Sequence, residues 1–190
     1  MKLPSMIKGW LNTTITPERL LEHYVSTNDE KYLTLLVEQF NLSIYHYLIS
    51  LSDKETAEDV LQTTWLKVMK VQSLTTKHTN VKSWLYTIAR NTLIDELRRQ
   101  QKWQWQALEA HHLNCCSPAQ EFEMNDRLAS FNFAINQLPF YQREAFIFQQ
   151  EGLSIIEICD VTNEHFETVK SRLRYARKNL KEMLGTPHEQ

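Results

Sequence analysis

Apolar residues recur at intervals of three and four along nearly the whole chain, and this spacing leaves little choice of fold. An α-helix has 3.6 residues per turn, so side chains at this spacing share one face of a helix. Only 3 glycines and 5 prolines occur among the 190 residues, and no stretch alternates long enough to indicate a sheet. The sequence therefore predicts an all-α protein.

The composition excludes several broad classes of protein. With 42% hydrophobic and 23% charged residues, the chain is neither disordered nor fibrous, and its length fits one domain or two small ones. It contains no run of the roughly 18 apolar residues that a membrane span needs, and its first residues lack the apolar core of a signal peptide. A cytoplasmic location is expected. An odd count of three cysteines without a secretion signal predicts reduced thiols.

The first half of the chain is predicted to form one helical module, residues 30–100. It contains three long apolar-periodic segments, and a polar loop at 72–80 precedes the third, whose end is cationic. The residues before this module, 1–29, show no pattern from which an element can be assigned. The three predicted helices cover residues 32–51, 53–71 and 81–100.

A second helical module is predicted at residues 125–184, followed by a short tail at 185–190. Between the modules, residues 101–124 lose the helical periodicity and mix glutamine, paired histidines, paired cysteines and Ser-Pro. We interpret this segment as a flexible linker with room for a helical turn or two. The predicted architecture is thus two small helical modules joined by a linker.

The second module carries the order helix, tight turn, basic helix. Ser154 and Glu157 form a capping-box pattern, which predicts that a helix begins there. Pro139 and Gly152 bracket the preceding helix. Asn163 is the residue type that, after glycine, best accepts the left-handed backbone of a tight turn. This order is that of a helix-turn-helix motif.

The last helix concentrates positive charge. From Glu164 to Leu184 there are six cations against three acids, whereas residues 103–151 hold two cations against six acids. An apolar stripe faces one way, and a polar, cationic side that suits the DNA major groove faces the other. A plain solvated surface helix is the alternative. The stripe contains Val169, Leu173, Ala176, Leu180 and Leu184.

Two faces in the first module also indicate binding. In the 81–100 helix, Arg90, Asn91 and Arg98 cluster on one side, and Trp84 at its start could stack on unpaired bases, although a core tryptophan is the alternative. In the 53–71 helix, Asp59, Gln62 and Leu66 lie opposite the predicted buried stripe of Ala57, Val60, Leu61 and Val68. Trp65 lies at the margin of that face. An exposed leucine between polar groups is typical of a protein-docking surface, with a solvated face as the alternative.

Five motifs, taken in order and spacing, resemble the extracytoplasmic-function group of bacterial sigma factors. They read "AEDVLQTTWLKV", "SWLYTIARNTLIDELRR", "LPFYQREAFIF", "EGLSIIEI" and "TVKSRLRYARKNL". The resemblance covers about residues 30–100 and 125–184, and it implies the sigma region two bundle followed by the region four helix-turn-helix. One departure is Asn163, which stands where the family usually has glycine.

The resemblance implies a subunit that binds core RNA polymerase, directs it to promoters and helps to open the DNA, with no catalytic site and no cofactor of its own. It implies three partners: the clamp helices of the polymerase's largest subunit, promoter DNA and an anti-sigma factor. The polymerase-docking motif corresponds to Asp59, Gln62, Trp65 and Leu66. The segment that recognises and melts the minus-ten element corresponds to Lys77, Asn80, Trp84, Arg90, Asn91, Asp95, Arg98 and Arg99. The reader of the minus-thirty-five element corresponds to Glu167, Thr168, Lys170, Ser171, Arg172, Arg174, Arg177 and Lys178.

Other interpretations stay open. A stand-alone helix-turn-helix regulator would use residues 125–184 on DNA and the first module to dimerise, and it would bind an operator tightly without polymerase. An enzyme is disfavoured, because no Gly-rich phosphate loop, nucleophile elbow or HExxH is present. A metal or redox role is a minor alternative for the 111–116 segment, whose adjacent pairs do not readily fill a tetrahedron; no metal site is predicted. Its candidate ligands are His111, His112, Cys115 and Cys116.

Overall fold

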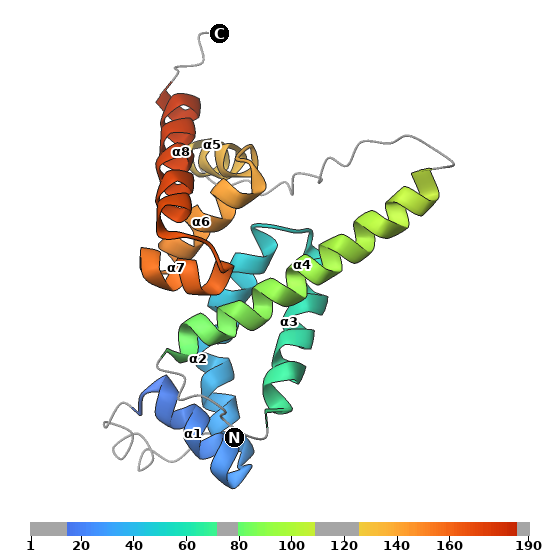
Figure 1. Ribbon diagram of the computed structural model, residues 1–190, viewed down its shortest axis with the longest axis vertical. Helices are drawn as coiled ribbons and strands as arrows, with labels where there is room; N and C mark the ends of the chain where they lie inside the picture. The colour runs from blue at the N-terminus through green and yellow to red at the C-terminus, as the bar shows by residue number, and fades with distance from the viewer. Residues whose placement is uncertain (1–14, 72–79, 109–125, 186–190) are drawn as a thin grey trace.

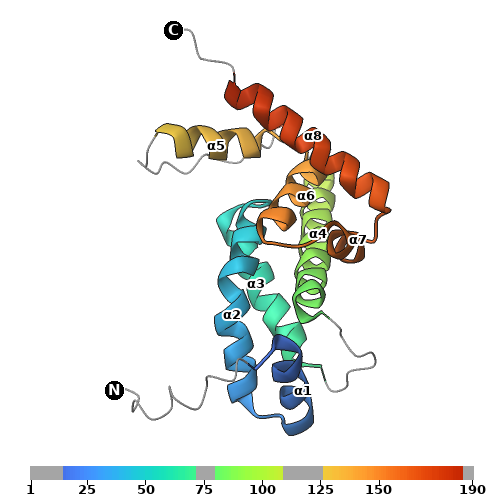
Figure 2. The ribbon, with the colours of Figure 1, turned by 90° about the vertical axis from the view of Figure 1, so that its left-hand side faces the viewer.

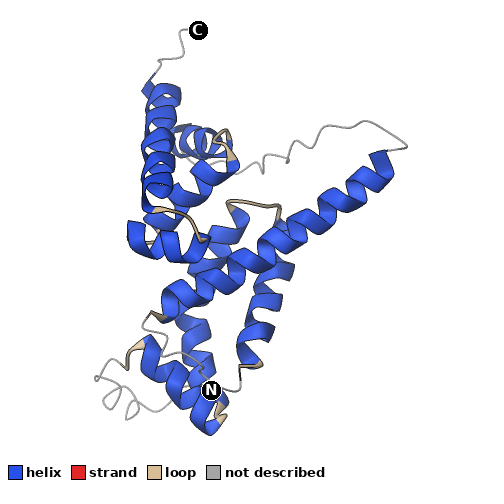
Figure 3. Cartoon of the chain, viewed as in Figure 1, coloured by secondary structure: helices blue, strands red, loops and turns tan. Residues whose placement is uncertain are grey.

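The computed structural model describes residues 15–71, 80–108 and 126–185, and all regular structure within these ranges is helical (Figures 1 and 3). The all-α prediction is confirmed. The described residues form an N-terminal module of four helices and a C-terminal module of four. The helices are α1 (Pro17–Thr27), α2 (Glu30–Ile49), α3 (Lys54–Met69), α4 (Val81–Leu108), α5 (Asp126–Asn136), α6 (Phe140–Gln150), α7 (Ile155–Thr162) and α8 (Phe166–Gly185).

The first helix, α1, lies in the segment where the sequence analysis assigned no element. Thr16 caps its start, Pro17 occupies the first turn, and Asn28 ends it in the left-handed conformation at φ 54°. Leu20 and Leu21 are buried against the rest of the N-terminal module. The local start and stop signals for α1 were therefore present in the sequence, although the segment is too short for a clear periodicity.

The N-terminal module is a bundle in which α2, α3 and α4 lie side by side, with α1 at one end (Figure 2). Its core combines aliphatic side chains with buried aromatic ones such as Phe40, Tyr47 and Tyr86. The Nζ of Lys67 on α3 donates to the hydroxyl of Thr92 on α4 at 2.8 Å, which ties these two helices together at their polar edge. The completely buried side chains include Leu36, Ile44, Leu48, Val68 and Leu85.

Helix α4 is longer than predicted. It runs to Leu108, eight residues past the expected end at residue 100. The added residues contain neither glycine nor proline, and a helix can continue through polar residues once its first turns are packed. The predicted linker therefore begins as helix, and the rest of it, residues 109–124, lies outside the described part of the chain.

The C-terminal module contains the predicted helix-turn-helix in α7 and α8. The Ser154 hydroxyl accepts from the backbone N–H of Glu157 at 3.3 Å, and the Glu157 carboxylate accepts from the backbone N–H of Ser154 at 2.6 Å. Asn163 adopts φ 54° at the turn, and Gly152 adopts φ 81° just past α6. The capping box and the left-handed asparagine are thus confirmed, so the motif forms without the usual glycine.

The buried stripe of α8 is confirmed except at its end. Val169, Leu173, Ala176 and Leu180 are buried, but Leu184 is 43% exposed. The prediction for Leu184 was wrong because the last turn of α8 extends past the helices against which it packs (Figure 1). A small core of its own holds α8 to α5 and α6, formed by Ala134, Ile135, Leu138, Phe146, Ala176 and Leu180.

The main hydrophobic core crosses from one module to the other. Phe148 of α6 is fully buried between Tyr47 of α2, stacked on it with ring centroids 4.5 Å apart, and Tyr86 of α4, edge-on at 5.6 Å. Ile158 and Val169 belong to the same cluster of buried residues. The first half of α4 packs against α7 (Figure 1). The sequence predicted two modules, but their periodicity carried no information about this contact.

Candidate protein- and nucleic-acid-binding surfaces

The predicted docking face of α3 borders a shallow groove of about 360 Å³ between α3 and α4. Asp59, Gln62 and Leu66 all line this groove and are exposed, Leu66 by 54%. Trp65 instead lies in the core, where its indole N–H donates to the side-chain oxygen of Asn41 at 2.9 Å. Of the four predicted docking residues, the structure thus presents three on one surface and buries the fourth beneath it.

The predicted minus-ten residues of α4 fall on different faces of the helix. Asp95 and Arg99 line the α3–α4 groove beside Asp59 and Gln62. At 100° per residue, Arg99 lies about 180° around the helix from Arg90. Arg99 pairs with Glu96 at 2.7 Å, and this hydrogen-bonded pair lowers the pKa of the Glu96 carboxyl. The structure therefore joins Asp95 and Arg99 to the docking face rather than to Arg90.

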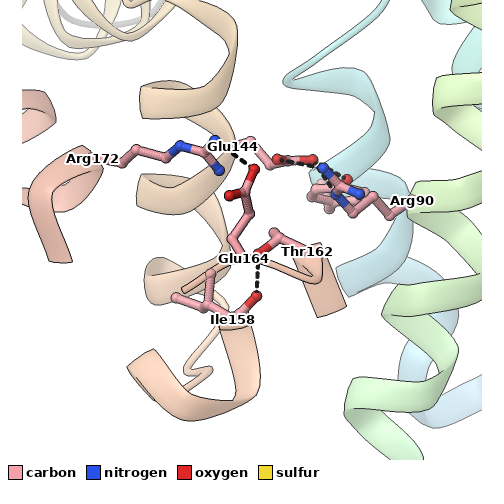
Figure 4. Close-up of polar contacts among 7 residues, drawn as sticks. Arg90, Glu144, Ile158, Thr162, Glu164 and Arg172 are labelled. Atoms are coloured by element: carbon pink, nitrogen blue, oxygen red, sulfur yellow. Dashed lines mark hydrogen bonds and ion pairs between the residues drawn. The ribbon is translucent and has the colours of Figure 1, made fainter. Parts of the chain in front are cut away.

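Arg90 faces the C-terminal module. Its Nε donates to Oε1 of Glu144 on α6 at 2.8 Å, and its Nη2 donates to Oε2 of the same carboxylate at 3.3 Å (Figure 4). The Tyr47 hydroxyl also donates to Glu144 Oε1, at 3.3 Å. Burial acts against the charge of Arg90, but its bonds to Glu144 outweigh burial, so the pKa of the guanidinium is raised.

The side chain of Asn80 also has hydrogen-bond partners within the protein. Its side-chain oxygen accepts from the backbone N–H of Ser83 at 3.0 Å and so caps the start of α4, while its amide nitrogen donates to Glu157 of α7. Trp84 is half-buried and packs against the main core. Asn91 and Arg98 are exposed. Lys77, the remaining predicted minus-ten residue, lies outside the described residues.

The predicted reading helix α8 presents most of its cations to solvent. The exposed cations are Lys170, Arg174, Arg177 and Lys178. Ion pairs within α8, such as that of Lys170 with Glu167 at 3.5 Å, lie at the surface and constrain these side chains weakly. Arg177 also donates to the side chain of Gln149 at 2.6 Å. An exposed cationic helix face of this kind suits the major groove.

Arg172 differs from the other predicted reading residues. Its guanidinium bonds the Glu164 carboxylate at 2.7 Å (Figure 4) and lies 4.7 Å from the ring centre of Tyr141 on α6. These contacts connect α8 to the turn that precedes it and to α6, so Arg172 holds the helix in position. Glu167 is exposed, and Thr168 and Ser171 are half-buried.

The acids that cross between the modules were not predicted from the sequence. Glu144 lies on one face of α6 with Phe140 and Phe148, four residues to either side, so a charge stands in an apolar stripe. A buried charge requires a partner in the folded protein, so the acid within this apolar stripe could have indicated an ion pair. Its partner, Arg90, is distant in sequence and was not predictable from periodicity.

The metal hypothesis for the 111–116 segment lies outside the described residues. Among the residues that are described, no cluster of three or more histidine, cysteine, aspartate or glutamate side chains could hold a metal ion. Cys159 is a free thiol, half-buried beside the main core, and burial raises its pKa. It packs as a small hydrophobic side chain.

Comparisons with known proteins identify both modules as parts of a sigma factor. The family model for Sigma-70 region 2 matches residues 36–103, and the model for Sigma-70, region 4 matches residues 129–180. The fold and these two matches thus define an RNA polymerase sigma factor.

Similar proteins show which group of sigma factors this chain resembles. The ECF RNA polymerase sigma factor SigM of Bacillus subtilis (strain 168) is 30% identical over 161 residues, covering 82% of this chain and 93% of the relative. The sigma factor RpoE from Bartonella quintana, solved in complex with the anti-sigma factor NepR, superposes with a TM-score of 0.68 at 28% identity, covering 83% of this chain and 99% of that one. CnrH, solved in complex with the cytosolic domain of CnrY, shares the fold with a TM-score of 0.64 at 18% identity.

The chain belongs to the extracytoplasmic-function (ECF) family of RNA polymerase sigma factors. It binds core RNA polymerase and directs transcription initiation at promoters. The stand-alone regulator is not favoured, because the similarity extends over both modules. The sigma factor family is not known to be catalytic. Within the described ranges, no helix has the length and apolar character required to span a membrane.

Proposed function

We propose that this sigma factor distributes polymerase docking, minus-ten recognition and minus-thirty-five recognition over three separate surfaces of the chain. The docking surface is the groove between α3 and α4. The minus-ten surface is formed by α4 as far as Arg98 and by the segment before it, and the minus-thirty-five surface is the exposed side of α8. The observation that carries the proposal is the exposed face of Asp59, Gln62 and Leu66, which no other part of the described chain covers.

The docking surface is proposed to receive the clamp helices of the largest polymerase subunit. Leu66 supplies an apolar anchor, and Asp59 and Gln62 supply an acceptor and an amide at its rim, an arrangement typical of interface hot spots. We assign Asp95 and Arg99 to this surface as well, because they line the same groove. Trp65 supports the surface from the core.

The minus-ten surface is proposed to combine stacking with hydrogen bonding. Trp84 at the start of α4 would stack on an unpaired base, and Asn80, Arg90, Asn91 and Arg98 would bond base edges and phosphates. Lys77, which lies outside the described residues, is assigned to the same proposed surface. Extraction of a base from the duplex costs free energy, which contacts of this kind offset.

The minus-thirty-five surface is proposed to lie in the major groove. Lys170 and Arg174 project from the exposed side of α8 near its start, where recognition helices contact base edges, with Glu167, Thr168 and Ser171 beside them. Arg177 and Lys178, further along, suit phosphates. Arg172 is assigned to positioning of the helix because it bonds Glu164.

We also propose that an anti-sigma factor holds this protein inactive in the cytoplasm, and that the chain has no catalytic site of its own. The support for such a partner is the structural similarity to the Bartonella quintana RpoE, which was solved with the anti-sigma factor NepR. A partner that covers the α3–α4 groove would exclude polymerase from it.

The test is co-elution with bacterial core RNA polymerase on a sizing column. The double variant Asp59→Ala with Gln62→Ala is expected to lose co-elution, with the apparent Kd rising at least about tenfold, because hot-spot truncations typically cost more than 1 kcal/mol each. Glu38→Ala with Gln39→Ala is the matched control, because it removes an exposed acid and an exposed amide from α2. Equal co-elution of both variants would overturn the docking assignment, and operator binding by the wild type without polymerase would favour the stand-alone regulator.

A further inference from the structure

The cations on the exposed side of α8 differ in the groups that hold them. Lys170 pairs with Glu167 at 3.5 Å, and Lys178 pairs with Glu182 at 3.7 Å. Arg174 lies between these two lysines, four residues from each, and no acid in the described part of the chain pairs with it. This arginine therefore differs from its neighbours along the same side of the helix.

Arg174 is held by an aromatic ring. Its guanidinium carbon lies over the ring of Tyr175, 4.9 Å from the ring centre. Tyr175 is itself 46% exposed, so the contact lies on the solvent side of α8. A guanidinium that stacks on a ring uses its face, and the N–H donors at its edge stay available for hydrogen bonds. The ring thus orients the guanidinium without occupying its donors.

Arg172 shows that an aromatic contact alone does not indicate a role in binding. Its guanidinium also lies over a ring, 4.7 Å from the centre of Tyr141, but the side chain is only 18% exposed. It donates to the Glu164 carboxylate at 2.7 Å, so its donors are used within the C-terminal module. Arg174 combines the same kind of aromatic contact with exposure to solvent and no carboxylate.

The pair formed by Arg174 and Tyr175 lies in the middle of the exposed face of α8. At 100° per residue, each of the two lies about 130° around the helix from the centre of the buried stripe, on opposite sides of it. A helix that enters the major groove with this face inward directs the pair at base edges. There, guanine presents two neighbouring acceptors, N7 and O6, which the donors of one arginine bond together.

We propose that Tyr175 is a positioning residue for Arg174, and that Arg174 recognises one guanine of the minus-thirty-five element through N7 and O6. This inference rests on the proposed assignment of α8 to that element, within which it names one base. Because the ring orients the guanidinium before DNA binds, less side-chain freedom is lost on binding. Loss of the ring therefore weakens discrimination at one base pair, whereas loss of a phosphate contact weakens binding to every sequence.

The test is the selection of duplex DNA by the holoenzyme, formed from the full chain and bacterial core RNA polymerase. One pool with a random central segment contains ordinary guanine, and a second contains 7-deazaguanine, in which a C–H group replaces the N7 acceptor. We expect the wild type to prefer guanine at one upstream position in the first pool. In the second pool that preference is expected to fall at least about fivefold. This comparison requires no variant, so it does not depend on whether a variant folds.

Variants then assign the contact to particular side chains. Arg174→Ala is expected to lose the same guanine preference and to keep the preferences at other positions. Tyr175→Ala is expected to lower it at least about twofold, and Tyr175→Phe, which keeps the ring, is expected to retain it. Lys178→Ala is the matched control on the same face. It is expected to weaken binding to all selected sequences and to reduce the salt dependence, with the guanine preference unchanged.

The outcomes distinguish this proposal from the assignment on which it rests. If the wild type shows no upstream sequence preference, the assignment of α8 to the minus-thirty-five element is wrong, and the guanine contact falls with it. If preferences exist but Arg174→Ala changes none of them, or the guanine preference persists without N7, only the guanine contact is overturned. A Tyr175→Ala variant with the wild-type preference, or a Tyr175→Phe variant that behaves like Tyr175→Ala, would overturn the positioning role of the ring.

Discussion

The two helices assigned to DNA differ in what surrounds them. Helix α8 carries Lys170, Arg174 and Lys178 on its solvent side, where the pairs with neighbouring acids lie at the surface. Arg90 in the first half of α4 and Asn80 just before this helix are bonded to glutamates of another module. Arginine is thus accessible to solvent on α8 and engaged by a carboxylate on α4. Whether a side chain can bind a partner depends on the packing of the modules, and a list of suitable residues does not contain that information.

The largest effect on stability is expected at Phe148, and it tests whether the surroundings of α4 differ from those of α8. Phe148→Ala removes the ring between Tyr47 and Tyr86, and the free energy of unfolding is expected to fall by about 3–5 kcal/mol, as for other buried phenylalanines. Urea denaturation followed by circular dichroism measures it.

The matched control is Phe133→Ala on α5, where the ring is 65% exposed. Its unfolding free energy is expected to change by less than about 0.5 kcal/mol. If the two alanine variants lose similar stability, Phe148 does not join the modules in solution.

An intermediate effect is expected for the ion pairs. A double-mutant cycle on Arg90→Met and Glu144→Gln is expected to give a coupling energy of about 3 kcal/mol, because each variant leaves a buried partner unpaired. The corresponding cycle on Lys178 and Glu182, a surface pair at 3.7 Å, is expected to give about 0.5 kcal/mol or less. Urea denaturation at low and high salt measures both, and only the surface pair should weaken markedly with salt. Equal coupling energies would show that Arg90 is as accessible as the cations of α8.

The smallest effect is expected at the cap of α7. Ser154→Ala removes the hydroxyl that accepts from the Glu157 N–H, and it is expected to destabilise the fold by about 1 kcal/mol. Thermal unfolding measures this change. A neutral result would mean that contact with α4, rather than the cap, sets the start of α7.

The other half of the capping box adds a pH dependence to this prediction. Hydrogen bonds from Ser154 lower the pKa of the Glu157 carboxyl below its ordinary value of 4.5. A lowered pKa contributes stability above that value, and the contribution is lost as the pH falls through the lowered pKa. The difference in stability between wild type and Glu157→Gln is therefore expected at pH 7 and should shrink below pH 4.5. A difference that does not change with pH would exclude the charge as its source.

The features that could be predicted from the sequence are those that short segments determine. The all-helical fold follows from periodicity, and the capping box at Ser154 and the turn at Asn163 follow from residue type. Helix α1 had comparable signals at Thr16 and Pro17, although its short length hid the pattern. The end of α4 was misplaced because loss of apolar periodicity does not stop a helix that meets no glycine or proline.

The arrangement of the candidate site was harder to predict, because it depends on tertiary packing. Periodicity placed Asp59, Gln62 and Leu66 on one exposed face, but it could not show that Asp95 and Arg99 line the same groove from another helix. It could not pair Arg90 with Glu144, 54 residues away. The roles of these residues in binding stay predictions, and the co-elution experiment tests the docking face.

The continuity of α4 has a mechanical consequence. This single helix of 28 residues, about 42 Å long, carries Asp95 and Arg99 in the proposed docking groove and Arg90 one to three turns away on the other side. A helix is stiff over this length. If the face with Asp95 and Arg99 were bound to polymerase, the orientation of the opposite face toward DNA would therefore be fixed. On the proposed assignments, α4 would set the position of the DNA relative to polymerase, and this spacing would depend on the unbroken helical backbone between residues 90 and 95.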